Sequence, residues 1–81
     1  MITPDTIKHL MSLDRFDIVR ILDRSGYPMC AFEDAEFLGI TESGDFCYTV
    51  SYYDEAGTGE AEQTRVYVRR EKATGEIVAE F

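Results

Sequence analysis

One stretch of the chain decides the fold: Phe46-Cys47-Tyr48-Thr49-Val50-Ser51-Tyr52-Tyr53. Bulky apolar side chains occupy every second position and alternate with smaller or more polar ones. A period of two is typical of a β-strand with one buried face, and these residue types suit a pleated surface. We therefore expect a central strand here, and we expect the apolar segments around it to form neighbouring strands or covering helices.

The segment before this stretch, residues 29–41, is expected to contain the first strand of the sheet. Alternation places Leu38 and Ile40 on one side of that strand, together with Glu36. The other side is formed by Ala35, Phe37 and Gly39. This division gives the first strand a mixed face, with two aliphatic side chains and one carboxylate on the side that we expect to be buried.

Residues 42–45 form a polar turn that fixes how the first two strands meet. If Ile40 stands opposite Phe46, then Leu38 stands opposite Tyr48. The apolar sets of both strands then lie on the same side of the sheet, so we predict this register.

The C-terminal third of the chain predicts a second hairpin. A strand over residues 64–70 leads through a loop at 71–76 into a strand over 77–81. In the register set by this loop, Val68 stands opposite Ala79, so the apolar faces of the two strands agree. The longer segment between the second and third strands is polar and rich in glycine.

Two helices precede the strands. Thr3 is a suitable N-cap and Pro4 suits the first helical position, so a helix begins there. Its apolar face consists of Ile7, Leu10 and Met11. The segment 12–14 offers a second helix start, and Gly26 provides a left-handed stop for the second helix. We expect much of that helix to be covered, because its apolar stripe is wide. The stripe consists of Phe16, Ile18, Val19, Ile21 and Leu22.

This order of elements predicts a single α+β domain over residues 1–81. Two N-terminal helices pack on one face of a four-stranded antiparallel meander sheet, which gives a two-layer arrangement. A chain of 81 residues can bury a small core of this kind. The fourth strand ends the chain with Phe81 at a sheet edge, so it is a candidate for pairing with a second copy in a homodimer.

Charge is distributed unevenly along the chain, whose net charge is −8. Residues 25–64 contain nine acids and no base, whereas the segments on either side are close to neutral. Such a surface disfavours direct contact with nucleic acid, because phosphates are bound by lysine and arginine. It favours a basic protein partner, whose association would be steered by charge and weakened by salt.

We therefore predict a non-enzymatic small acidic protein that binds a basic protein as an inhibitor or accessory protein, nucleic-acid mimicry included. Small acidic inhibitors such as DNA mimics have a similar size and charge, although this likeness is one of composition only. A tyrosine joins the predicted surface because exposed tyrosines beside carboxylates are typical contact residues. The predicted partner-binding residues are Glu33, Asp34, Glu36, Glu42, Asp45, Tyr53, Asp54, Glu55, Glu60 and Glu62.

Two other functions remain open at this point. The chain could be a self-associating structural or accessory domain whose acidity serves solubility. It could also be a small thiol enzyme in which Cys30 or Cys47 acts with His9, but no motif supports this pairing. We expect no cofactor and no metal, since the segment 54–62 lacks the order of ligands of a calcium loop and the cysteines lack zinc spacing.

Features of the sequence also predict the cellular compartment of the protein. The N-terminus has no basic start followed by a long apolar run, and no apolar stretch approaches the length of a membrane span. Two cysteines are more typical of free thiols in a reducing compartment than of a disulfide framework. We therefore expect a cytoplasmic protein that has no membrane partner.

Overall fold

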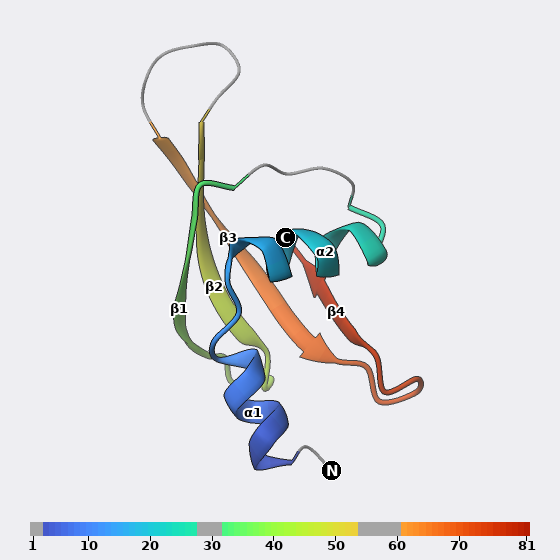
Figure 1. Cartoon of the computed structure of the whole chain (residues 1–81). Helices are drawn as coiled ribbons and strands as arrows, with labels where there is room; N and C mark the ends of the chain where they lie inside the picture. The colour runs from blue at the N-terminus through green and yellow to red at the C-terminus, as the bar shows by residue number, and fades with distance from the viewer. Residues whose placement is uncertain (1–2, 28–31, 54–60) are drawn as a thin grey trace.

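The computed structural model describes residues 3–27, 32–53 and 61–81, the side chains of Tyr53 and Ala61 excepted (Figure 1). Its four strands form one antiparallel sheet in the order β1-β2-β3-β4. This arrangement confirms the predicted α+β class, with two helices at the N-terminus and a meander sheet. The elements are α1 (Pro4–Leu10), α2 (Arg15–Arg24), β1 (Asp34–Ile40), β2 (Phe46–Tyr53), β3 (Ala61–Arg70) and β4 (Ile77–Glu80).

The core lies between the sheet and the helices. The alternation in β2 acts as predicted: Phe46, Tyr48 and Val50 are buried on the face that α2 covers. Helix α2 lies across this face and packs against β4 and β1, at the two edges of the sheet (Figure 1). Helix α1 buries Leu10 at its end, but Ile7 and Met11, which we expected on its apolar face, are exposed. The core is completed by Leu10, Leu13, Ile18, Ile21, Leu22, Phe32, Val66, Val68 and Ala79.

The junction between the two helices is fixed to the sheet by one side chain. The hydroxyl of Tyr48 donates a hydrogen bond to the carbonyl oxygen of Leu10, at the end of α1. The same hydroxyl accepts a hydrogen bond from the backbone N–H of Leu13, with a distance of 2.9 Å between the two atoms. Two buried backbone groups between α1 and α2 thus find partners in the core.

Helix α2 begins and ends as its sequence predicts, but one residue of the predicted stripe is not covered. Asp14 is the N-cap and forms a capping box with Asp17, while Gly26 follows the helix with a φ of 95°. Phe16, which we expected on the covered face, is 61% exposed. Phe16 is exposed because the buried face of α2 is centred on Ile18, Ile21 and Leu22. The guanidinium carbon of Arg15 lies over the Phe16 ring, 4.7 Å from its centroid.

Strand β1 departs from the predicted register. Ile40 does stand opposite Phe46, but Phe37, and not Leu38, stands opposite Tyr48. The register shifts between Phe37 and Gly39, so that Leu38 is an extra residue in a β-bulge.

The bulge has a clear physical reason. Regular pairing from the turn would place Glu36 on the covered face, where an unpaired carboxylate is costly to bury. One inserted residue exchanges the two sides of β1 beyond the bulge. Ala35 and Phe37 now pack against the core, and the Phe37 ring lies 5.4 Å from that of Tyr48. Glu36 faces the open side of the sheet and is exposed.

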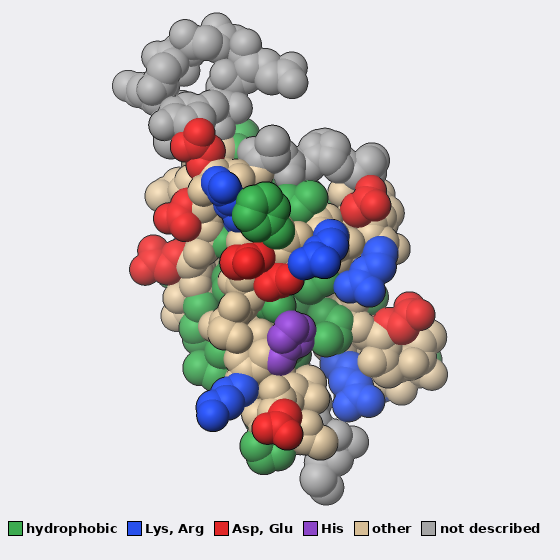
Figure 2. Space-filling view, viewed as in Figure 1, with side chains coloured by type: hydrophobic (Ala, Val, Ile, Leu, Met, Phe, Trp, Pro, Cys, Tyr) green, Lys and Arg blue, Asp and Glu red, His purple; other side chains and the backbone are tan. Residues whose placement is uncertain are grey.

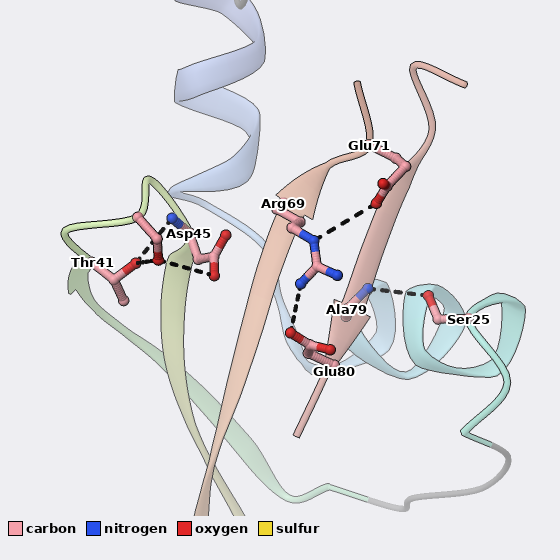
Figure 3. Close-up of polar contacts among 8 residues, drawn as sticks. Ser25, Thr41, Asp45, Arg69, Glu71, Ala79 and Glu80 are labelled. Atoms are coloured by element: carbon pink, nitrogen blue, oxygen red, sulfur yellow. Dashed lines mark hydrogen bonds and ion pairs between the residues drawn. The ribbon is translucent and has the colours of Figure 1, made fainter. Parts of the chain in front are cut away.

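The second hairpin forms with the predicted register, and its outer edge is covered. Val68 stands opposite Ala79, and Gly75 in the loop has a φ of 74°. The backbone N–H of Ala79 points away from β3 and donates to the hydroxyl oxygen of Ser25, at the end of α2, at 3.1 Å (Figure 3). This backbone N–H of β4 is thus already bonded to Ser25 and is not free to pair with a further strand at the β4 edge.

Candidate partner-binding surface

Six of the nine acids between residues 25 and 64 are described, and they fall at three separate places. Asp54, Glu55 and Glu60 lie outside the described residues, as does the side chain of Tyr53. The described acids of the predicted surface therefore lie at three places and not in one patch. The six are Glu33, Asp34 and Glu36 at the start of β1, Glu42 and Asp45 in the β1–β2 turn, and Glu62 in β3.

Four of these acids lie in β1 or next to its ends, and we call them the acidic edge: Glu33, Asp34, Glu36 and Glu42. All four are exposed. At ~3.3 Å per residue, β1 is about 20 Å long; it carries Asp34 and Glu36, and Glu33 and Glu42 lie beyond its two ends. Figure 2 shows acidic side chains along the side of the molecule where β1 lies. Because of the bulge, Asp34 and Glu36 share the face of the sheet that carries no helix.

Among the described residues, the carboxylates of the acidic edge form no ion pair. The ion pairs of the described residues join Arg20 to Asp17, and Arg69 to Glu71 and Glu80, and none includes an acid of the edge. Two bases lie near it: the Arg15 guanidinium donates to the backbone carbonyl of Glu33 at 2.9 Å, and Arg65 stands in register with Glu36 across Thr49. Carboxylates that form no ion pair at an exposed edge provide a negative potential to which a basic surface can respond.

Two aliphatic side chains interrupt the acidic edge, and sequence reasoning had placed them in the core. Leu38 is 52% exposed and Ile40 is 54% exposed, and both lie between Glu36 and Glu42 in sequence. An apolar centre with a charged rim is the usual composition of a protein interface. The exposure of Leu38 follows from the bulge, which is determined by packing across the sheet. Ile40 keeps its predicted place opposite Phe46 and is exposed at the end of an edge strand.

Asp45 and Glu62 are not part of the acidic edge, and both form hydrogen bonds within the chain. The Asp45 backbone N–H donates to the Thr41 hydroxyl at 3.0 Å, and its carboxylate accepts a bond from Ser43 at 3.5 Å (Figure 3). Glu62 accepts a hydrogen bond from the Tyr52 hydroxyl at 3.0 Å.

The Asp45 carboxylate also acts on a neighbouring base. The pKa of Arg69 is raised chiefly by its hydrogen bond to Glu80, and the nearby charge of Asp45 adds to this effect. Asp45 thus contributes to the hydrogen bonds that hold the β1–β2 turn, and its part in partner binding stays a prediction.

The structure does not bring Cys47 and His9 together. Cys47 is a buried free thiol that stands between Gly39 and Tyr67 on the open face of the sheet. His9 is exposed on α1, which the neighbouring residue Tyr48 contacts from the other face. The sheet therefore separates this thiol from this imidazole, and Cys30 lies outside the described residues.

Comparisons of the chain with protein-family models, with curated proteins and with solved structures found no match. Within the described ranges, no helix combines the length and apolar character that crossing a membrane requires. Among the same residues, no three potential ligands from histidine, cysteine, aspartate and glutamate gather as a metal site would require.

Proposed function

We propose that this protein acts without catalysis, in the cytoplasm, by binding a basic protein partner through the acidic edge and the exposed aliphatic side chains within it. The observation that carries the proposal is the arrangement on β1. Leu38 and Ile40 are about half exposed and are flanked by carboxylates that have no ion pair among the described residues.

The two kinds of side chain have different tasks in this proposal. Exposed carboxylates attract a positively charged surface at long range and so accelerate association, an effect that salt screens. Aliphatic side chains act only at contact, where their burial slows dissociation. The partner is therefore a protein with a basic surface around an apolar depression, and a groove that normally holds nucleic acid meets the first requirement.

The proposal is tested by separating these two rates. A partner is first captured from the native host at low salt, and its binding is then measured by surface kinetics. Replacing Asp34 and Glu36 with Asn and Gln should slow association and leave dissociation almost unchanged. Replacing Leu38 with Ala should accelerate dissociation instead. If both variants bind like the wild type, the acidic edge is not the binding surface.

A second function, self-association, is favoured by the same two aliphatic side chains, because exposed apolar residues on an edge strand also suit a second copy. Sedimentation of the wild type and of Leu38→Asp distinguishes the two. A wild-type dimer that Leu38→Asp converts to a monomer supports self-association, whereas a wild-type monomer leaves the basic partner as the proposal.

A further inference from the structure

A groove of about 330 Å³ lies between the end of α1 and the exposed side of α2. Its floor is apolar, since Leu13 and Ile21 are each only 4% exposed. Its rim carries ionisable groups, and Figure 2 shows the histidine beside apolar and basic side chains on this face. The lining residues are His9, Leu13, Asp17, Arg20, Ile21 and Arg24.

The rim of the groove is positive, unlike the chain as a whole. Arg20 is paired with Asp17 at 2.9 Å, yet its side chain is still 73% exposed. Arg24 is exposed and has no ion pair among the described residues. A net positive charge therefore remains around an apolar floor, in a protein whose net charge is −8.

The spacing of the two arginines suggests the form of a ligand. Positions four apart in a helix are separated by about 6 Å along its axis. Alternate residues of an extended chain are separated by about 6.6 Å and point the same way, while the residue between them points to the opposite side. Two carboxylates at alternate positions can thus face Arg20 and Arg24 together from one side of an extended segment.

We propose that this groove binds an extended acidic segment of another protein, with two carboxylates at alternate positions facing Arg20 and Arg24. Carboxylates suit the rim better than phosphates, because Asp17 stays within it and repels a doubly charged group more strongly. The site is independent of the acidic edge: the groove lies on the helical side of the molecule, whereas Asp34 and Glu36 face the open side of the sheet.

The probe for this site is a fluorescein-labelled peptide with the core Glu-Leu-Glu, measured by fluorescence anisotropy at low salt. A peptide with Gln-Leu-Gln is its uncharged control. Arg20→Gln and Arg24→Gln should each weaken binding of the acidic peptide by about 3–10-fold, since each removes a charge-assisted hydrogen bond. The matched variant Arg65→Gln changes an exposed arginine of β3, away from the groove, and should bind like the wild type.

The double variant Asp34→Asn/Glu36→Gln should also bind the peptide like the wild type, which separates this test from that of the proposed function. Amide shifts in an NMR titration should cluster on residues of α2 and on His9. The proposal is overturned if the acidic peptide does not bind, if the Gln control binds equally well, or if Arg65→Gln weakens binding as much as Arg24→Gln. Tighter binding of a phosphoserine peptide would overturn the choice of carboxylates, and peptide-sensitive dimerisation would indicate a second copy as the occupant.

Discussion

Tyr48 illustrates how a single residue connects the sheet to the helices. Its ring fills the core, and its hydroxyl satisfies the carbonyl of Leu10 and the N–H of Leu13. Tyr48→Phe keeps the ring but leaves both backbone groups without this partner. We expect the free energy of unfolding to fall by about 1–3 kcal/mol, the usual cost of leaving a buried polar group unsatisfied. Urea unfolding measures this loss, and an unchanged midpoint would show that the hydroxyl is dispensable.

The same hydroxyl should make stability depend on alkaline pH. Burial raises the pKa of Tyr48 above its ordinary value of 10.0, although the hydrogen bond from Leu13 acts in the opposite direction. The folded state therefore holds this proton more tightly than the unfolded state does. The resulting stabilisation is fully present below pH 10 and is lost as the pH rises through the folded-state pKa. Between pH 9.5 and 11, we expect wild-type stability to fall more steeply than that of Tyr48→Phe; parallel curves would contradict this.

Asp14 should give the opposite dependence, at acidic pH. The hydrogen bond from the Asp17 backbone N–H lowers the pKa of Asp14 below its ordinary value of 3.8. The folded state thus favours the carboxylate, and the stabilisation present above about pH 4 is lost as the pH falls through the folded-state pKa. Asp14→Asn keeps a capping side chain that does not titrate. Thermal melts between pH 2.5 and 6 should show a shallower acid loss for this variant, and equal slopes would speak against Asp14.

At the scale of the elements, the buried face of the sheet is the best-founded prediction. Val50 and Val66 are completely buried. Replacing either with Ala should lower the free energy of unfolding by about 1–3 kcal/mol, through lost apolar burial and the cavity that remains. Val78 is the matched control, since it lies on the open face of β4 and is only partly buried. Chemical denaturation of all three variants tests this, and equal losses would mean that the two faces contribute alike.

All four strands could be predicted from sequence, but the register of β1 beyond its bulge could not. The alternation of β2 and the two short turns are properties of neighbouring residues, so they fixed the pairs Ile40–Phe46 and Val68–Ala79. The bulge at Leu38 depends on a choice between burying Phe37 and burying Glu36. That choice is made across the sheet and leaves no mark on the alternation of the strand itself.

The same distinction holds for the functional surfaces. The excess of acids in residues 25–64 is visible in the sequence, but its division between an acidic edge and internal hydrogen bonds is not. The alternation of β1 places Leu38 in the core because it carries no sign of the bulge, and it places Ile40 there because its partner Phe46 is buried. The groove depends on how α1 meets α2, since His9 and Arg24 approach it from different helices. Only the tertiary structure brings such residues together.

On the scale of the whole molecule, the structure separates two charged surfaces that the net charge conceals. The acidic edge follows β1 and is directed away from the core, while the helical side carries a groove with a positive rim. A charge change on one surface should therefore leave binding at the other nearly unaffected, apart from the weak long-range field that salt screens.

The most direct test of the central claim is the association rate constant with the captured partner, measured at low salt and at about 0.5 M salt, where screening is nearly complete. One variant neutralises three carboxylates of the acidic edge as Asp34→Asn, Glu36→Gln and Glu42→Gln. Its control makes the same change in net charge elsewhere, as Asp5→Asn, Asp23→Asn and Glu76→Gln, and both must first match the wild type in thermal stability. We predict that the edge variant associates about tenfold more slowly at low salt, that the control stays close to the wild type, and that high salt removes the difference. Equal rates for the edge variant and the control, or a wild-type rate that does not change with salt, would contradict the claim that the acidic edge captures a basic partner.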